Sequence, residues 1–275
     1  MIKIKIIVFS LCLSASAVII APCFAQTDTP FTLKNKIKGK FSYLNVDNLD
    51  NIYVITQTNQ LKKINANGDS LAIFNDVKRF GNPSYIDVSN PLKVLLYYNK
   101  FSTTVVLDRF FNVRNTINFR KQNIFLATSI AASYDNNIWI FDEQNYILKK
   151  VDENGKTLVE TVDWRTFFDT VPSPIKIMDR NNFVYLYDTA KGFYIFDYYG
   201  AFKTKLSFLH WQFVEISGDY LYGFNQHKLY SYNILTTEQK EYALPSFIKD
   251  YQFIEVMNGK LYLLKENGVE IYQLK

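Results

Sequence analysis

The stretch DNLDNIYVITQTNQLKKINANGDSL, residues 47–71, decides the fold. It reads as a turn, a short strand with alternating apolar side chains, a polar turn, a second strand that begins with Leu-Lys-Lys, and an Asn-Gly turn. Residues 133–158, SYDNNIWIFDEQNYILKKVDENGKTL, repeat this order almost position by position. Strand chemistry that returns at a fixed period of about 40 residues indicates an architecture built from repeated small sheets.

Four further copies of this unit are more degenerate. They lie in residues 89–117, 179–206, 217–242 and 258–275, and every copy follows a short leading strand. Six residues mark equivalent positions in the leading strands: Tyr43, Tyr85, Ser129, Ile175, Phe213 and Phe253. Successive marks are 42, 44, 46, 38 and 40 residues apart. Six units of four strands predict an all-β fold, a six-bladed β-propeller.

The composition favours strands over helices. The segments are short and rich in Ile, Val, Tyr and Phe, which suit a pleated, half-buried surface. Asn-Gly pairs such as Asn67-Gly68 and Asn154-Gly155 separate them, and Asn-Gly favours the positive φ angles of tight hairpins. Only residues 162–168, VDWRTFF, have a helical look. That stretch is too short to change the fold class.

The two ends of the chain are expected to meet in one blade. The last unit, residues 253–275, has room for three strands rather than four, and one strand-like segment, Pro30 to Lys36, precedes the first unit. We expect this segment to pair with the last blade as its outer strand, because closure would remove an exposed strand edge. A loose N-terminal arm is the alternative.

The first 25 residues have the features of a secretory signal peptide. A basic start precedes a mainly apolar stretch, residues 6–21, and the small residues Cys23 and Ala25 stand at its end. This order predicts cleavage after Ala25, export, and a single propeller domain in residues 26–275. An uncleaved anchor and lipidation of Cys23 are the alternatives. The periplasm is the expected compartment, with the extracellular space or the outer membrane as alternatives.

Cysteine usage and charge narrow the possible chemistry and partners. Cys12 and Cys23 both fall inside the predicted leader, so the mature chain would have no thiol for a disulfide, a nucleophile or a metal site. The chain has 31 Lys and Arg against 26 Asp and Glu, without a basic cluster. Neither nucleic acid nor an anionic membrane surface is implied as a partner, and no membrane span is expected after cleavage.

A search for catalytic motifs finds little. The two histidines, His210 and His227, lie in different units, so a metal site built on two or three imidazoles is not expected. The sequence holds no G-x-S-x-G elbow, no P-loop and no dinucleotide fingerprint. His210 and Trp211 are expected to pack between blades, with a place near the ring axis as the alternative. No cofactor is expected, although calcium stays open.

One set of residues could form an axial site. With the innermost strands in register, one residue of each falls in a column that faces the axis: Asn45, Asp87, Ala131, Ile177, Glu215 and Glu255, with Lys176 beside it. Converging carboxylates can hold a hard cation such as calcium, or anchor a cationic or hydroxylated ligand. The predicted metal ligands are Asn45, Asp87, Glu215 and Glu255. Alternatively, these groups hydrogen bond around channel water or pair with Lys176.

The longest connection is a second candidate site. Residues 161–173, TVDWRTFFDTVPS, carry Trp164, Phe167 and Phe168 between the third and fourth units. Large aromatic side chains in an inter-blade insertion suit a surface that contacts a protein partner. A plug that packs over one end of the ring would use the same three rings without a partner. The sequence leaves both interpretations open.

The repeat D-x-x-x-N-I-Y-V…L-K-K-I…N-G-x-x-L in residues 47–71, echoed in residues 133–158, resembles the six-bladed β-propellers of the NHL/TolB-like kind. It is similar particularly to small exported propellers of Bacteroidota. The resemblance implies one of three roles: a scaffold in an envelope complex, a carbohydrate- or peptide-binding module, or a lactonase-like enzyme. The enzymes of this class use a channel metal held by Glu, Asn and Asp side chains, which only the axial column could mimic here.

These observations favour a non-catalytic, exported propeller. We expect it to act as a binding or scaffold protein in a cell-envelope or secretion-related assembly, with a protein partner. The alternative is a metal-dependent, lactonase-like hydrolase that uses the channel carboxylates. A sugar-binding role is a third possibility, because Trp and Tyr side chains on a rim can stack on sugar rings.

Overall fold

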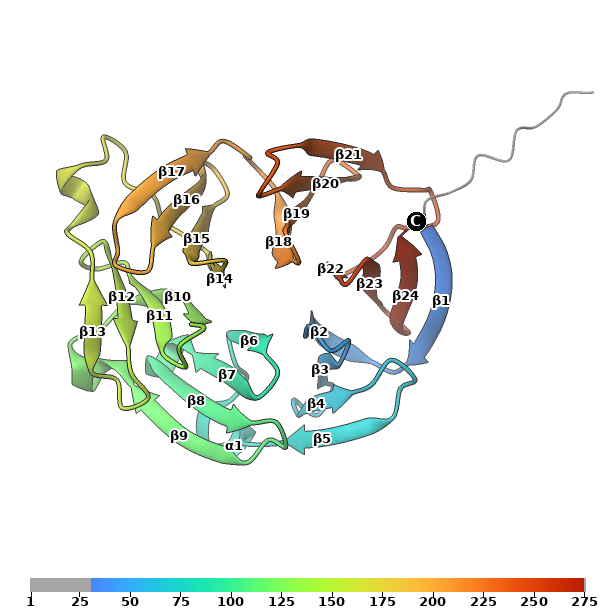
Figure 1. The fold of residues 1–275 in the computed structure, drawn as a ribbon. Coiled ribbons are helices and arrows are strands. Elements are labelled where there is room, and N and C mark those ends of the chain that lie inside the picture. The colour runs from blue at the N-terminus through green and yellow to red at the C-terminus, as the bar shows by residue number, and fades with distance from the viewer. Residues whose placement is uncertain (1–30, 275) are drawn as a thin grey trace, which may run out of the picture.

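The structure, a computed structural model, describes residues 31–274. They form six four-stranded antiparallel sheets arranged as blades around a central axis (Figure 1). The predicted six-bladed β-propeller is therefore confirmed. The predicted leader, residues 1–25 with both cysteines, lies outside the described residues.

In the first five blades the strands follow chain order from the axis outward. Blade 1 consists of β2 (Phe41–Val46), β3 (Ile52–Thr56), β4 (Leu61–Ile64) and β5 (Ser70–Phe74), and blade 2 of β6 (Tyr85–Asn90), β7 (Lys93–Tyr98), β8 (Thr103–Asp108) and β9 (Val113–Asn118). Blade 3 consists of β10 (Ala127–Ala132), β11 (Ile138–Asp142), β12 (Ile147–Val151) and β13 (Thr157–Glu160), and blade 4 of β14 (Lys176–Arg180), β15 (Phe183–Asp188), β16 (Gly192–Asp197) and β17 (Phe202–Leu206). Blade 5 consists of β18 (Gln212–Ser217), β19 (Tyr220–Asn225), β20 (Lys228–Asn233) and β21 (Gln239–Ala243).

Blade 6 is assembled from both ends of the chain. It contains β22 (Phe253–Met257), β23 (Lys260–Lys265) and β24 (Gly268–Leu274), and its outer strand is β1 (Phe31–Lys38). β1 runs antiparallel to β24, pairing Phe31 with Leu274 and Lys38 with Gly268. In Figure 1 the first and last strands lie side by side at the edge of the ring. The predicted closure by the N-terminal strand is confirmed.

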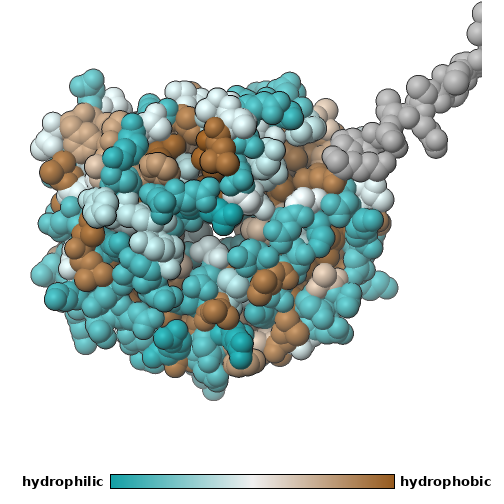
Figure 2. Space-filling model, in the orientation of Figure 1, coloured by the Kyte–Doolittle hydropathy of each residue, from teal (hydrophilic) through white to brown (hydrophobic). Residues whose placement is uncertain are grey.

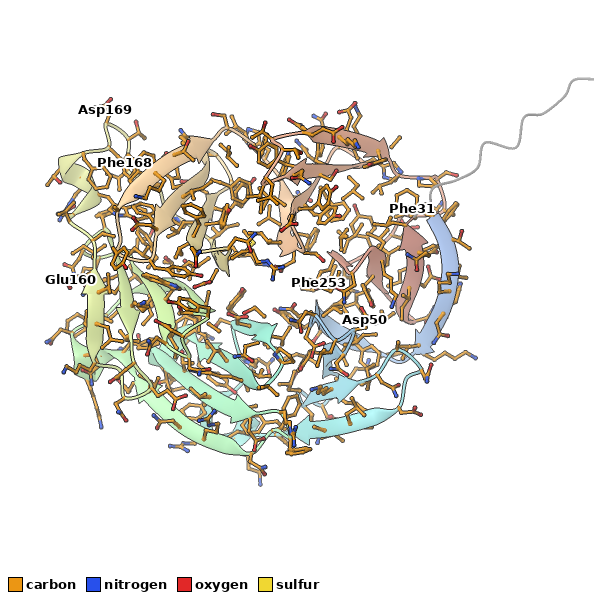
Figure 3. All side chains as sticks on the ribbon, viewed as in Figure 1. Phe31, Asp50, Glu160, Phe168, Asp169 and Phe253 are labelled. Carbon is orange, nitrogen blue, oxygen red and sulfur yellow. The ribbon has the colours of Figure 1, made fainter. Side chains whose placement is uncertain are left out.

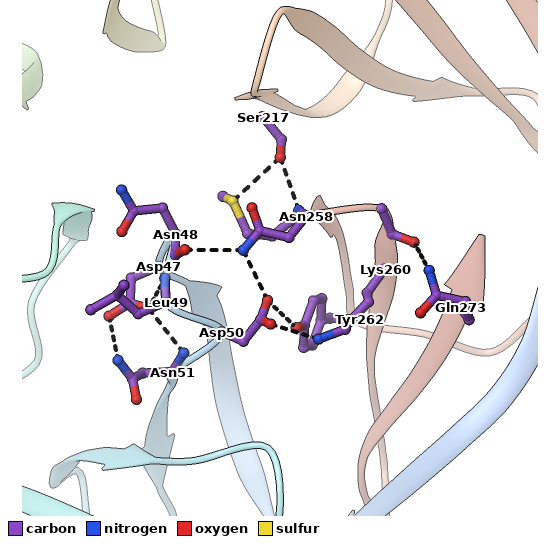
Figure 4. Close-up of polar contacts among 12 residues, drawn as sticks. Asp47, Asn48, Leu49, Asp50, Asn51, Ser217, Asn258, Lys260, Tyr262 and Gln273 are labelled. Atoms are coloured by element: carbon purple, nitrogen blue, oxygen red, sulfur yellow. Dashed lines mark hydrogen bonds and ion pairs between the residues drawn. The ribbon is translucent and has the colours of Figure 1, made fainter. Parts of the chain in front are cut away.

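A polar network also ties blade 6 to blade 1. The Asp50 carboxylate accepts hydrogen bonds from Lys260 Nζ at 2.6 Å, the Tyr262 hydroxyl at 3.0 Å and Asn258 Nδ2 at 3.1 Å (Figure 4). Asn258 Nδ2 also donates to the carbonyl oxygen of Asn48. Because these donors belong to blade 6 and the acceptors to blade 1, the network secures the junction where the ring closes.

The turn residues of the repeat have a clear local function. Asp152 Oδ1 accepts from the backbone amides of Asn154 at 2.8 Å and Lys156 at 2.9 Å, which fixes the turn between β12 and β13. The same arrangement recurs at three further aspartates: Asp47, Asp108 and Asp197. Gly155 takes a φ of 87° in its turn, whereas Phe111 holds a φ of 69° at the matching position of blade 2. An aromatic side chain there is strained and is held by its packing in the core.

The hydrophobic core is divided among the six junctions between blades. Each of the six buried clusters contains side chains from two neighbouring blades. Examples are Trp139, Ile177 and Tyr194, which lie together between blades 3 and 4. Because both faces of a blade are covered by its neighbours, a strand can be apolar on both sides. All six residues of β7 are buried, and Lys93 is the only charged one among them.

The described chain contains four short helical turns: α1 (Val77–Phe80), η1 (Asn99–Phe101), η2 (Phe119–Gln122) and η3 (Trp164–Thr166). Of these, η1 lies within blade 2, between β7 and β8, and the other three lie between blades. The helical look of residues 162–168 corresponds to η3, a single 3-10 turn. None of the helices in residues 31–274 has the length and apolar character needed to cross a membrane.

Candidate functional site

The innermost strands of the six blades surround the ring axis. They are β2, β6, β10, β14, β18 and β22, and each contacts the innermost strands on either side of it. Along a strand every second residue points to the same side, so residues two apart form successive tiers around the axis. In Figure 2 the centre of the ring is hollowed and surrounded mainly by hydrophilic residues.

Two cavities lie on this axis, one at each end. The first, the aromatic mouth, has a volume of about 480 Å³ and lies where the innermost strands begin. The second, the polar mouth, has a volume of about 210 Å³ and lies where these strands end, beside residues such as Asn48, Ser89 and Asn258. Four residues line both cavities: Asn45, Tyr85, Lys176 and Glu215. We call this level the waist of the channel.

The predicted column is correct in five blades and wrong by one residue in blade 4. Asn45 pairs with Tyr53 across its sheet, and Glu255 pairs with Tyr262. The residue of β14 that pairs with the corresponding Tyr185 is Met178, not Ile177. Ile177 is 1% exposed and packs between blades 3 and 4. A slip of one residue moves a side chain to the opposite face of a strand, which explains the error.

Three of the four predicted metal ligands are bound to the backbone of the next blade. Asn45 Nδ2 donates to the carbonyl oxygen of Ile86 at 2.9 Å. Asp87 Oδ2 accepts from the Ala132 amide at 2.6 Å, and Glu255 Oε1 accepts from the Val46 amide at 3.2 Å. These side chains therefore join blade 1 to blade 2, blade 2 to blade 3, and blade 6 to blade 1. Each acts as a polar link in the ring.

The fourth predicted ligand, Glu215, forms an ion pair at the waist. Its Oε2 lies 2.6 Å from Lys176 Nζ, and its Oε1 accepts from the amide of Ile216 at 3.0 Å. Burial by itself would lower the pKa of Lys176, but the carboxylates of Glu215 and Glu255 outweigh burial and raise that pKa. The ammonium group of Lys176 is therefore held firmly in its charged form. This pairing is one of the alternatives that the sequence left open.

Glu255 and Asp87 lie in surroundings that disfavour their ionised forms. Burial and then repulsion by Glu215 raise the pKa of Glu255 well above its usual value, against the opposing effect of Lys176. Burial also raises the pKa of Asp87, although the amides of Ser89 and Ala132 donate to its oxygens. These two carboxyl groups with raised pKa values lie on either side of the waist, Asp87 in the polar mouth and Glu255 in the aromatic mouth, so the channel as a whole is short of positive charge.

The carboxylates meet the geometric needs of a metal ion only in part. Within residues 31–274 no group of three or more His, Cys, Asp or Glu side chains is arranged to hold a metal. Both Asp87 oxygens already accept backbone hydrogen bonds, and one oxygen of Glu215 faces Lys176. A calcium ion needs six to eight oxygen ligands. The calcium site at Asn45, Asp87, Glu215 and Glu255 stays a prediction.

The aromatic mouth is a feature that the sequence interpretation did not single out. Its wall contains Tyr43, Phe213 and Phe253, with ring centroids 5.3 Å apart for Tyr43 and Phe253 and 5.8 Å apart for Phe213 and Phe253. All three rings are half-buried. Ile175 stands at the same mouth with 61% of its surface exposed. All four of these residues appear in the sequence analysis only as marks of the repeat, although an aromatic side chain two residues before the column, as at Tyr43, Phe213 and Phe253, is a signal that could have indicated the mouth.

The aromatic insertion lies away from the axis. Trp164 is fully buried between blades 3 and 4, stacked on Phe196 at 5.0 Å and packed against Phe141 at 4.7 Å. Its Nε1 donates to Thr161 Oγ1 at 3.0 Å. In Figure 3 Phe168 lies toward the outer edge of the ring, whereas Phe253 lies toward its centre. Of the three predicted partner-binding residues, Trp164 is thus out of reach of a partner, and Phe167 is the exposed one at 41%.

The two histidines are both exposed and lie on separate connections, before β18 and between β19 and β20. Trp211, next to His210, is buried between blades 4 and 5, with its ring stacked on Phe208 at 4.5 Å. It also lines the aromatic mouth. The expected packing between blades therefore holds for Trp211 and not for His210, which is exposed.

The sequence matches no protein-family model and no curated protein. Solved structures do resemble the fold. A streptogramin B lyase covers 84% of this chain and 78% of its own, with 12% identity and a TM-score of 0.57. A catalytically inactive virginiamycin B lyase from Staphylococcus aureus with quinupristin covers 89% of both chains, with 13% identity and a TM-score of 0.57. The Neurospora crassa Pan2 WD40 domain covers 89% of this chain and 95% of its own, with 10% identity and a TM-score of 0.59. At such low identity these similarities establish the propeller fold alone.

Proposed function

We propose that this chain is an exported, non-catalytic binding protein that acts as a scaffold in a cell-envelope or secretion-related assembly. The observation that carries the proposal is the aromatic mouth. It offers a concave site of about 480 Å³ whose wall is formed by half-buried rings of Tyr43, Phe213 and Phe253. Concave sites with apolar walls and a few polar groups at the base are the usual form of binding sites.

The hydrogen bonds of the polar side chains around the axis favour a binding function over a catalytic one. Asn45, Asp87 and Glu255 are each bound to the backbone of the next blade, and Glu215 is paired with Lys176. Side chains that are needed to hold the ring together are poorly placed to move protons or to exchange ligands during a reaction cycle. A ligand can use the same site without disturbing these links.

Export and a place in the envelope are supported by the sequence. The basic start, the apolar stretch and the small residues at the end of residues 1–25 are typical of a signal peptide. The resemblance of the repeat to exported NHL/TolB-like propellers of Bacteroidota agrees with that assignment. The periplasm is the compartment that we propose, with a protein of the cell envelope as the partner.

Site-specific crosslinking tests the proposal. A photoreactive p-benzoylphenylalanine at Ile175, beside the aromatic mouth, should capture the same envelope protein in repeated experiments in the native cells. The matched control is Leu71, which is 49% exposed on the outer strand β5 and should capture nothing. A third probe at Phe167 tests the insertion. Crosslinks from Phe167 alone would move the partner to the insertion, and no crosslink from any position would contradict the scaffold role.

A metal-dependent hydrolase is the second candidate function. The observation that favours it is the crowding of carboxylates in the channel: burial raises the pKa values of Asp87 and Glu255, and repulsion by Glu215 adds to both shifts. A cation bound between them would remove this repulsion. Thermal unfolding with added calcium and with EDTA decides this candidate, because a channel ion would raise the melting temperature Tm by mass action. Equal Tm values in both conditions would exclude a structural or catalytic calcium ion here.

A further inference from the structure

The base of the aromatic mouth holds one carboxylate oxygen that has no partner. Glu255 is 8% exposed and lines the aromatic mouth. Its Oε1 accepts a hydrogen bond from the Val46 amide, but Oε2 has no hydrogen-bond or ion-pair partner among residues 31–274. Oε2 is not one of the fully buried, unpartnered side-chain atoms of the described chain, so it is accessible from the cavity that Glu255 lines. Its hydrogen-bond donor can therefore be supplied by water or by a ligand that enters the cavity.

The charged side chains around this oxygen have a net charge of −1 when all are ionised, so one added positive charge would balance them. Three charged side chains line the aromatic mouth: Lys176, Glu215 and Glu255. Lys176 Nζ is 2.6 Å from Glu215 Oε2, so these two charges balance each other. Glu255 is left as the unbalanced charge when it is ionised. A ligand with a single positive charge would neutralise the site.

The walls select the kind of cation. Tyr43, Phe213 and Phe253 present aromatic rings at the mouth, and the face of an aromatic ring attracts an organic cation within about 6 Å of its centroid. A metal ion would instead need several oxygen ligands, and here one free carboxylate oxygen stands among apolar rings. The combination suits an alkylammonium group, whose methylene stem packs on the rings while its N–H groups reach the carboxylate.

We propose that the aromatic mouth binds a protonated primary amine on an alkyl stem, of the kind that a lysine side chain of the partner presents, with Glu255 as its counter-ion. This inference rests on the proposed binding function and names its ligand class. The amine nitrogen donates to Glu255 Oε2, and the stem lies against Tyr43, Phe213 and Phe253. Tyr85 also lines the aromatic mouth, and its hydroxyl, which has no hydrogen-bond partner within the described chain, offers a second acceptor.

The test compares two probes that differ in charge. Nα-acetyl-lysine methylamide keeps the ammonium group, whereas its Nε-acetylated form keeps the stem and loses the charge. Each is titrated into the purified, 15N-labelled protein and followed by amide chemical shifts. We expect saturable shifts around β2, β18 and β22 with the charged probe, and at least tenfold weaker binding of the acetylated probe.

Two variants and one control complete the experiment. Glu255→Gln keeps an acceptor for the Val46 amide but removes the charge, and should weaken binding of the lysine probe at least tenfold. Phe253→Leu keeps an apolar wall without a ring and should weaken it severalfold. Glu241→Gln removes an exposed carboxylate on the outer strand β21 and should change nothing. Unchanged amide spectra outside the mouth show that each variant is folded.

The possible outcomes separate this inference from the proposed function. Equal binding of both probes would overturn the amine specificity and leave a binding site at the mouth. Binding of the lysine probe that survives Glu255→Gln would remove Glu255 as the counter-ion and overturn the inference as well. Absence of saturable shifts with the lysine probe would also overturn it, whereas the crosslinking from Ile175 decides the scaffold role independently.

Discussion

The molecule contains two groups of aromatic rings that differ in almost every respect except composition. Around Trp164, rings of blades 3 and 4 stack within 5.0 Å and are sealed from solvent. At the aromatic mouth, Tyr43, Phe213 and Phe253 lie 5.3 to 5.8 Å from their neighbours and stay half-exposed beside a cavity. The indole N–H of the first group donates to Thr161, whereas Oε2 of Glu255, at the base of the second group, has no hydrogen-bond partner within residues 31–274.

The difference shows how to separate stabilising aromatic residues from functional ones. A ring that is fully buried with its polar atoms satisfied contributes its whole surface to stability. A ring that lines a cavity keeps part of its apolar surface exposed to solvent, and this part is buried only when a ligand binds. The two groups should therefore respond in opposite ways to the same substitution, with one losing stability and the other losing binding.

The largest effect is expected at Trp164. Trp164→Ala removes a fully buried ring between two blades and should lower the free energy of unfolding by about 3–5 kcal/mol. Urea unfolding followed by circular dichroism measures the loss. Trp164→Phe, which keeps a ring against Phe141 and Phe196, is the matched control and should recover most of it. A loss below about 1 kcal/mol would show that residues 161–173 can detach without destabilising the propeller.

A smaller stability effect is expected at Phe253. Because its ring is half-buried at the cavity, Phe253→Ala should lower the free energy of unfolding by only about 1–2 kcal/mol. The same variant should abolish crosslinking from Ile175. A stability loss as large as that of Trp164→Ala, with crosslinking intact, would erase the distinction between the two aromatic groups.

Glu255→Gln should change the pH dependence of stability. Since the pKa of Glu255 is raised in the folded state, its neutral form stabilises the fold below about pH 4.5, and that contribution is lost as the pH rises through the raised pKa. Glutamine stays neutral throughout. The variant should therefore match the wild type in Tm at pH 4 and exceed it at pH 8. Thermal unfolding in sodium phosphate, which supplies no organic cation, measures the difference.

The opposite sign would contradict the environment that we describe for Glu255. A variant less stable than the wild type at pH 8 would mean that the ionised carboxylate is favourably paired in the unliganded protein. Asp87→Asn is a useful companion, because Asp87 also has a raised pKa but both of its oxygens accept backbone hydrogen bonds. It should destabilise the propeller, since the side-chain amide of Asn has a single acceptor oxygen and cannot accept from both the Ser89 and the Ala132 backbone amides.

The smallest effect is expected at Phe167. Its ring is 41% exposed, so Phe167→Ala should change the free energy of unfolding by less than about 0.5–1 kcal/mol. Urea unfolding beside Trp164→Ala gives a direct comparison within one insertion. Loss of the envelope crosslink from Ile175 in this variant would indicate that the insertion forms part of the partner surface.

Much of the fold could be predicted from the sequence because the same pattern of strands and turns occurs in several units. Asn65 and Asp152 each accept hydrogen bonds from the backbone amides of a turn, and Gly68 and Gly155 take positive φ angles in these two turns. The register of β14 could not be read in this way. Residues 174–178 are Pro-Ile-Lys-Ile-Met, in which either Ile177 or Met178 fits an apolar position. Only pairing with Tyr185 in β15 settles which one faces the axis.

The candidate site was predicted less well than the fold, for a physical reason. Asn45, Asp87, Glu215 and Glu255 all line the axial cavities, as expected. Three of them, Asn45, Asp87 and Glu255, hydrogen bond to backbone groups of neighbouring blades, whereas Glu215 pairs with Lys176. Backbone partners carry no side-chain signal, so a sequence cannot reveal that an axial carboxylate is already occupied. That Oε2 of Glu255 has no partner within residues 31–274 can be seen only in the tertiary structure.

The pairing of Phe31 with Leu274 determines which blade can form last during folding. Blades 1 to 5 each need only a local segment, and they can form while synthesis continues. Blade 6 needs β1 and β24 together, and bringing distant segments into contact is slow because the entropy of a long loop opposes it. The final closure therefore waits for the last strand.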